Sequence, residues 1–293
     1  MSLQHGSAPI LREVTQNNER AKRIQEITLD PPAKTRIITI SNQKGGVGKT
    51  TTAVNLAAAL ARKGMRVLVI DLDPQGNAST ALGVEHHNQV LGSYEVLVQE
   101  LPMADAVKPS PEHQNLFCLP ATINLAGAEI EMVEVAGREL VLRNALNAYL
   151  GSVERIDYVF IDSPPSLGLL TVNALSAATE VLVPIQCEYY ALEGVTQLVS
   201  NIERIKRGLN PALVVSSILL TMFDNRTNLS TDVAQEVRRF FPSQTLEATI
   251  PRSVRLSEAP SFGQTAITYD PKNTGSLAYQ EAAIELAQRG AQL

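Results

Sequence analysis

Short apolar segments recur along the chain at intervals long enough to hold a helix, and this spacing limits the possible folds more than any other feature of the sequence. The segments are nearly all apolar and do not alternate with polar residues. Strands buried on both faces of a parallel sheet have this pattern. The predicted strands are residues 36–41, 67–70, 116–119, 158–161, 181–183 and 213–220.

The stretches between these strands predict helices at residues 50–63, 122–150, 166–178, 192–207 and 229–240. Strands that alternate with helices indicate the α/β class, with a single doubly wound, mostly parallel sheet and helices on both faces. We expect residues 35–293 to form one domain, since no linker or internal repeat interrupts them. Residues 1–34 lack sustained periodicity, so we expect a flexible extension with a short helix around residues 19–27.

A glycine-rich segment, residues 43–51, follows the first predicted strand and opens the first predicted helix. Glycines let the backbone curl so that its N–H groups point at phosphate oxygens, and the helix adds its positive amino end. A lysine here reaches the β- and γ-phosphates, and the next hydroxyl binds Mg²⁺. We therefore predict a nucleotide-phosphate site with Lys49 as the phosphate lysine and Thr50 as a magnesium ligand.

Carboxylates follow two other predicted strands, where ligand sites of doubly wound sheets lie. Asp71 and Asp73 are two positions apart on an extended segment, so one can serve the Mg²⁺ shell while the other orients water. Asp162 comes directly after four apolar residues and matches a Walker B position. A simple turn at residues 71–77, or a helix cap at Ser163 or Ser166, remains an alternative explanation for these residues.

The pattern Lys-Gly-Gly-x-Gly-Lys-Thr-Thr departs from the standard Walker A sequence, because Gln43 stands where that pattern has glycine and Lys44 is a second lysine. It resembles the deviant Walker A motif of the ParA/MinD group of ATPases. Over residues ~36–290 the chain is more specifically similar to the Soj/ParA chromosome-partitioning ATPases. The segments that carry this resemblance are residues 43–83, 120–129, 161–170, 186–194, 219–228 and 250–260.

The resemblance implies a role for each site residue. Lys44 would reach the nucleotide of the other subunit and Lys49 that of its own. Asp73 would position the attacking water, and Asp71 would join Thr50 and Asp162 around Mg²⁺. The expected ATP contacts are Lys44, Gly45, Gly46, Val47, Gly48, Lys49, Thr50 and Thr51, with Pro251 and Ser253 near the adenine.

The resemblance also implies a Mg²⁺-dependent ATP hydrolase that forms a homodimer on ATP, binds double-stranded DNA non-specifically and responds to a ParB-type partner. The net charge of −5 argues against indiscriminate binding to polyanions, but residues 204–255 hold 8 basic and 4 acidic side chains. Contacts to DNA phosphates need several such cations on one face. The candidates are Arg226, Arg238, Arg239, Arg252 and Arg255, with Lys206, Arg207 and Lys272 at the periphery.

Three alternatives share the nucleotide chemistry. A MinD-type protein attaches to membrane through a basic amphipathic tail, but residues 277–293 contain Glu281, Glu285 and a single base, Arg289. An iron–sulfur reductase needs two cysteines facing a dimer axis, but Cys187 lies in a segment typical of partitioning proteins and Cys118 is expected to be a buried strand residue. A metabolic ligase needs a substrate pocket that the sequence does not reveal. No apolar run is long enough to span a membrane, and two cysteines are too few for a disulfide framework, so we expect a cytoplasmic protein. The resemblance implies that it associates with the nucleoid.

Overall fold

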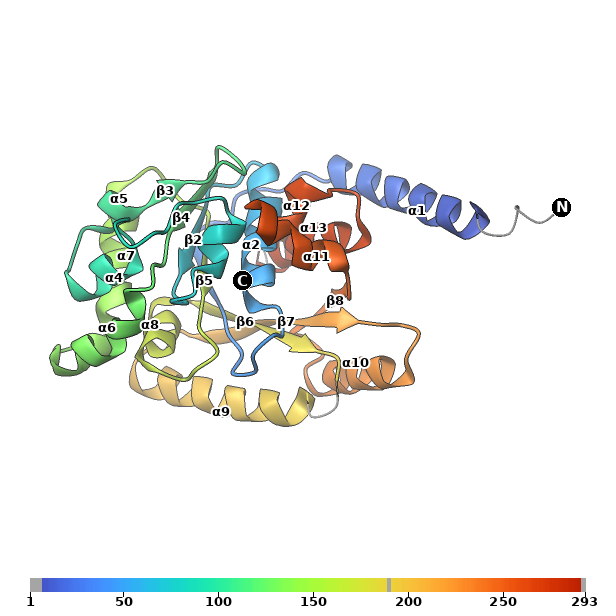
Figure 1. Cartoon of the computed structure of the whole chain (residues 1–293). Helices are drawn as coiled ribbons and strands as arrows, with labels where there is room; N and C mark the ends of the chain where they lie inside the picture. The colour runs from blue at the N-terminus through green and yellow to red at the C-terminus, as the bar shows by residue number, and fades with distance from the viewer. Residues whose placement is uncertain (1–6, 189–190, 291–293) are drawn as a thin grey trace.

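The structure, a computed structural model, describes residues 7–188 and 191–290. Over these residues the strands form one eight-stranded sheet in the order β3-β4-β2-β5-β1-β6-β7-β8 (Figure 1). All neighbours are parallel except the short edge strand β3, which runs antiparallel to β4. The strands are β1 (Arg36–Ile40), β2 (Val67–Asp71), β3 (Lys108–Pro109), β4 (Leu116–Leu119), β5 (Tyr158–Asp162), β6 (Glu180–Gln186), β7 (Val214–Phe223) and β8 (Thr245–Pro251).

Helices cover both faces of the sheet, because successive residues of each strand point to opposite sides. Ile37 of β1 belongs to one core cluster, whereas Ile38 belongs to the other. The first face is covered by α4 (Ser93–Val98), α5 (Met103–Ala106), α6 (Leu125–Glu131), α7 (Val141–Ser152), α8 (Leu169–Ala177), α9 (Ala191–Gly208) and α10 (Asn228–Phe240). The second is covered by α2 (Lys49–Arg62), α3 (Asn77–Ala81), α11 (Val254–Glu258), α12 (Ala266–Tyr269) and α13 (Thr274–Gly290). The predicted fold class is confirmed.

Several stretches differ from the sequence prediction. The single helix expected over residues 122–150 is wrong: α6 is followed by the 3₁₀ turns η1 (Met132–Glu134) and η2 (Arg138–Leu140) before α7 begins. Gly137, which directly precedes η2, has a φ of 71°, a left-handed conformation that cannot continue a helix. The edge strand β8 was not predicted, because its polar residues hide the apolar pattern.

The N-terminal region contains a longer helix than the expected segment 19–27, namely α1 (Ser7–Glu26). Its far end projects from the body, and its last turns pack on α13 (Figure 1). The first six residues of the predicted extension and residues 291–293 of the predicted tail lie outside the described residues. The division of the chain at residue 34 stays a prediction.

Candidate nucleotide site

The phosphate loop connects the end of β1 to the start of α2, as predicted. Gly46 and Gly48 have φ values of 73° and 87°, which side-chain-bearing residues rarely adopt. Gly48 directly precedes α2, and no side chain among the described residues caps this helix end. The first N–H groups of a helix have no partner within the helix, so together with the loop they form a binding surface for an anion.

Three hydrogen bonds fix the loop, and two of them reach neighbouring strands. The side-chain amide of Asn42 donates to the carbonyl of Pro184 at 2.8 Å and accepts from the N–H of Lys44 at 3.0 Å. The hydroxyl of Thr221 donates to the carbonyl of Val47 at 2.9 Å. Sequence analysis missed both positioning residues. Thr221 nevertheless comes directly after the apolar residues of the predicted strand 213–220, which is the same signal that identified the carboxylates.

The two lysines of the loop occupy different environments. Lys49 is only 8% exposed, and its ammonium donates to the carbonyl of Lys44 at 3.2 Å, inside the curl of the loop. Burial lowers the pKa of Lys49, and the negative charges of Asp162 and Asp73 act in the opposite direction. The Lys44 side chain is 52% exposed and makes an ion pair with Glu188 at 3.3 Å. Lys49 therefore serves this loop, whereas Lys44 points to the surface.

Two predicted carboxylates lie side by side next to the loop. Asp71 ends β2 and Asp162 ends β5, and the two are direct partners in the parallel register. The hydroxyl of Thr50 donates to Asp162 Oδ2 at 2.7 Å. Burial raises the pKa of Asp162 well above its usual range, and the charge of Asp71 raises it further. Burial also raises the pKa of Asp71, to about 6.

The bonds of each carboxylate suggest different roles. Asp71 accepts from the N–H and hydroxyl of Ser79 at 2.9 and 2.8 Å and from the N–H of Asp73 at 3.1 Å, so it is occupied in holding the loop before α3. Asp162 Oδ1 is buried and has no hydrogen-bond partner within the described chain. Asp73 is half-buried and accepts from the N–H of Gln75 at 3.0 Å. A buried carboxylate oxygen beside a threonine hydroxyl fits a hydrated Mg²⁺ ion.

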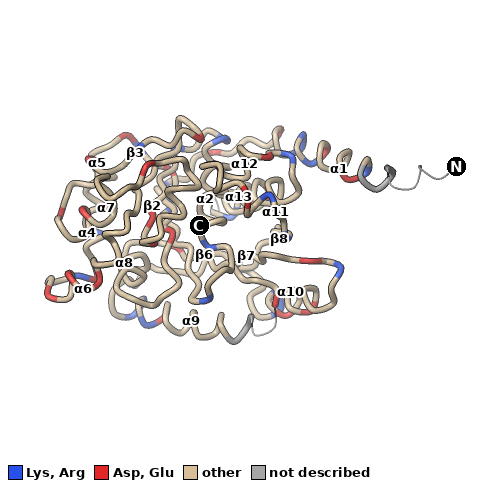
Figure 2. Tube along the Cα trace, viewed as in Figure 1, with Lys and Arg blue, Asp and Glu red and all other residues tan. Residues whose placement is uncertain are grey.

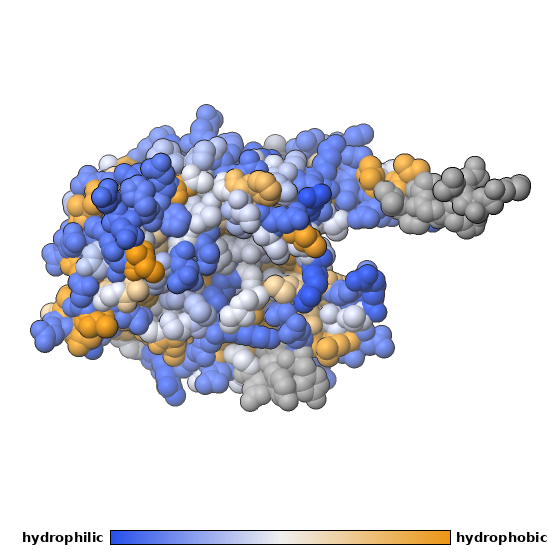
Figure 3. All heavy atoms as spheres, viewed as in Figure 1, coloured by the Kyte–Doolittle hydropathy of each residue, from blue (hydrophilic) through white to orange (hydrophobic). Residues whose placement is uncertain are grey.

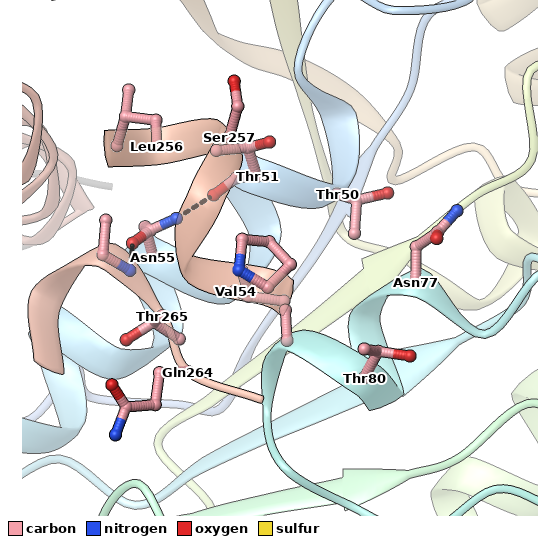
Figure 4. A pocket seen from close by; sticks show the side chains of 13 residues that line it. Thr50, Thr51, Val54, Asn55, Asn77, Thr80, Leu256, Ser257, Gln264 and Thr265 are labelled. Carbon is pink, nitrogen blue, oxygen red and sulfur yellow. Dashed lines mark hydrogen bonds between the residues drawn. The ribbon is translucent and has the colours of Figure 1, made fainter. Parts of the chain in front are cut away.

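Two cavities adjoin the first turn of α2. The first, about 240 Å³, extends from Thr50 and Asn77 to Gln264 and Thr265 (Figure 4). The second, about 290 Å³, is lined by Gly48 and Thr51 on one side and by the segment from Pro251 to Ser253 on the other. The structure thus brings Pro251 and Ser253 to the phosphate loop from more than 200 positions along the chain.

The five predicted DNA-contacting arginines lie on different elements, and Figure 2 shows Lys and Arg dispersed along the chain rather than gathered in one place. Arg226 and Arg252 line one cavity. Arg238 and Arg239 lie in the last turn of α10, and Arg255 lies in α11. Several have acidic partners: Arg226 pairs with Asp224 at 2.7 Å, and Arg255 with Glu258 at 3.0 Å.

The structure also bears on two of the alternatives. Cys118 and Cys187 are buried in the core clusters on opposite faces of the sheet, so they do not form the exposed cysteine pair of an iron–sulfur site. Helix α13 packs its apolar residues against α2 and β8 rather than presenting them at the surface. Among the described helices, none is long and apolar enough to cross a membrane.

Comparison with known proteins gives a consistent set of relatives. A family model described as an AAA domain matches residues 35–215. The sporulation initiation inhibitor protein Soj of Bacillus subtilis is 49% identical over 255 residues, which are 87% of this chain and 99% of that protein. The chromosome partitioning protein ParA of Myxococcus xanthus is 52% identical over 254 residues, which are 87% of this chain and 88% of that protein.

A solved structure from Mycobacterium smegmatis, named cobyrinic acid a,c-diamide synthase, is 39% identical and superposes with a TM-score of 0.73 over 85% of this chain and 92% of its own. It contains bound ADP and magnesium, and a second structure of the same protein contains an ATP analog and magnesium.

Proposed function

Because the chain belongs to the Soj/ParA family of chromosome-partitioning proteins, we propose that it is an ATP-dependent DNA-partitioning ATPase. In this proposal ATP binding joins two copies, the dimer binds DNA non-specifically, and hydrolysis stimulated by a ParB-type centromere-binding protein releases it. One observation supports this most strongly: the same loop buries Lys49 and exposes Lys44. This difference in exposure suits Lys49 to the nucleotide bound by its own subunit and Lys44 to the nucleotide of a second copy.

The residues from Lys44 to Thr51 hold the phosphates in this proposal, through backbone N–H groups and the ammonium of Lys49. Pro251 and Ser253 flank the adenine side, because their segment shares the cavity of about 290 Å³ with Gly48 and Thr51. The magnesium and nucleotides bound to the Mycobacterium smegmatis relative support ATP and Mg²⁺ as the ligands.

Thr50 and Asp162 hold Mg²⁺ in this proposal, and Asp71 lies in the outer shell. Bound Mg²⁺ neutralises charge on the phosphate oxygens. The residues of the chain complete the chemistry: Lys49 stabilises negative charge on the β- and γ-phosphates, and Asp73 orients the attacking water. The hydrogen bonds of Asn42 and Thr221 fix the phosphate loop before the reaction, so Lys49 and Thr50 are held in place without further reorganisation.

Non-specific DNA binding uses Arg226, Arg238, Arg239, Arg252 and Arg255 in this proposal. They lie on different elements of one subunit, so the complete phosphate-binding surface requires two copies. The acidic partners of Arg226 and Arg255 must be displaced or must share these arginines with DNA. The protein would then act in the cytoplasm on the nucleoid. The synthase name of the 39%-identical structure keeps a metabolic ligase as the alternative, and ligases do not require DNA.

Mixed subunits test the shared site. We expect Lys49→Ala to lose at least about 30-fold in ATP affinity, since removing one partner of a buried charge contact costs about 2–5 kcal/mol. Lys44→Ala should bind ATP but not hydrolyse it. Mixing the two variants should restore part of the activity, because a Lys44→Ala subunit keeps Lys49 and receives Lys44 from its partner. Inactivity at every mixing ratio would contradict the cross-subunit role of Lys44.

A further inference from the structure

Helix α1, to which the proposed function assigns no role, is fastened to two helices of the nucleotide site. Ile24 is 4% exposed and packs against Leu277 and Ile284 of α13. Arg20 donates two hydrogen bonds to the carboxylate of Glu281, at 3.0 and 2.7 Å. Lys63, which caps the carboxyl end of α2, donates to the carbonyls of Ile24 and, at 2.6 Å, Ile27. These contacts hold the end of α1 against α2 and α13.

The middle of α1 reaches the first turn of α13. Asn17 donates from its side-chain amide to the hydroxyl of Thr274 at 3.3 Å, and that hydroxyl donates to Glu13 at 3.3 Å. The neighbouring residue, Asn273, accepts from the hydroxyl of Ser253 at 3.0 Å and from the N–H of Gly275. A continuous series of contacts therefore runs from α1 through residues 273–274 to Ser253.

Ser253 belongs to a segment that separates two cavities. Residues 251–253 line the cavity of about 290 Å³, which Gly48 and Thr51 also line, and on their other side they line a cavity of about 560 Å³. Glu13 and Arg20 of α1 line the cavity of about 560 Å³ but not the smaller one. Figure 3 shows the surface hollowed between the projecting α1 and the body near α10. One side of the segment thus faces the proposed nucleotide and the other faces α1.

We propose that α1 is a positioning element for the base side of the nucleotide cavity. By holding residues 273–274, it fixes the segment from Pro251 to Ser253 and so raises the affinity for the nucleoside part of ATP and ADP. This inference rests on the proposed function, because it takes this cavity as the adenine side. The family model begins at residue 35, so α1 is an addition to the matched domain.

The contacts of α1 are partly exposed, so their influence on binding is moderate. The side chains of Arg20 and Glu281 are 23% and 37% exposed. Substitutions within a connected contact network typically change coupling by an amount equivalent to about two- to thirtyfold in affinity. For Arg20→Glu, in which two carboxylates would face each other, we expect the lower part of this range, about three- to tenfold, because the contact is partly exposed.

The test measures binding of ATP, ADP and inorganic tripolyphosphate to the full-length chain by calorimetry. Arg20→Glu should weaken ATP and ADP binding about three- to tenfold and leave tripolyphosphate binding unchanged, because tripolyphosphate contacts the phosphate loop alone. The exchanged pair Arg20→Glu with Glu281→Arg should restore the affinity. Arg12→Glu makes the same charge change at an exposed position of α1 and should have no effect.

Unchanged ADP affinity in Arg20→Glu, or equal weakening of ADP and tripolyphosphate, would overturn the inference. Equal weakening would mean that α1 supports the fold as a whole. If Arg20→Glu does not fold, Asn17→Ala and the exchanged pair provide the same comparison. Failure of the wild-type protein to bind ATP would instead overturn the proposed function together with this inference.

Discussion

Asp71 and Asp162 illustrate how single residues at this site combine burial with unfavourable charge. They lie on adjacent strands in direct register, and both carboxyls have raised pKa values, Asp71 to about 6. Two buried carboxylates side by side are costly when both are ionised, and a nearby cation reduces this cost. Lys49 supplies one such charge, and the proposed Mg²⁺ would supply more.

The raised pKa values predict how stability depends on pH. Unfolded carboxyls titrate near pH 4, so between about pH 4 and pH 6 the folded, metal-free protein binds more protons than the unfolded chain. Its free energy of unfolding should therefore fall as pH rises through this window. Asp162→Asn should reduce the fall, as measured by urea unfolding in the presence of a chelator. Asp232→Asn, an exposed control on α10, should behave like the wild type, and an identical response of both variants would contradict the account.

Asp73 is expected to act mainly in the transition state. Asp73→Ala should retain ATP affinity and slow hydrolysis by about 10²- to 10⁴-fold, the usual contribution of a positioned carboxylate. Single-turnover measurements with pre-bound ATP separate this effect from binding. A variant that hydrolyses at the wild-type rate would assign the water-orienting role to another residue.

Residues that a local sequence pattern marks could be predicted, whereas residues whose partners only the fold specifies could not. Recognisable apolar strands come before Lys49, Thr50 and Asp162 in the sequence. In the structure Thr50 and Asp162 meet through a hydrogen bond. Asn42 and Thr221 hold the loop through contacts with distant segments, and nothing in their neighbourhoods specified these partners. The roles of the predicted residues in binding and hydrolysis stay predictions.

At the scale of helices and strands, predictions succeeded where the apolar pattern was strong. Strands β1, β2 and β5 are buried along their whole length, so their sequences are nearly all apolar. The edge strand β8 has exposed and half-buried positions, including Glu247 and Ala248, and its pattern was too weak to detect. The break between α6 and α7 includes the extended Val135 and the left-handed Gly137, which a helical apolar pattern conceals.

One buried contact joins α2 to α13 and predicts a measurable change in stability. The hydroxyl of Tyr279 lies 3.1 Å from that of Thr52, and both residues are buried. Tyr279→Phe removes this hydrogen bond and should lower the free energy of unfolding by about 1 kcal/mol. Tyr269→Phe is the matched control, because within the described residues the Tyr269 hydroxyl makes only a long contact with the exposed Arg255, at 3.5 Å. Equal losses in both variants would contradict the assignment.

For the whole molecule, the sheet order explains why the site forms where it does. Strand β1 lies between β5 and β6, so the loop that follows β1 meets Asp162 at the end of β5 and Pro184 in β6. Ligand sites of doubly wound sheets lie at such points. The proposed function then requires that nucleotide state control the assembly of two copies, since the basic residues of one copy are dispersed.

The most direct test of this account is a DNA-binding titration of the wild-type protein with ATP, with ADP and without nucleotide, over a range of salt concentrations. We expect tight binding with ATP only. If about five phosphates are contacted, log K should fall against log salt with a slope of roughly −4 to −5. Arg226→Glu should weaken binding to all sequences alike and leave ATP-driven dimerisation intact. Equal DNA affinity with ATP and ADP, or no DNA binding at all, would contradict the proposal that ATP turnover drives DNA partitioning.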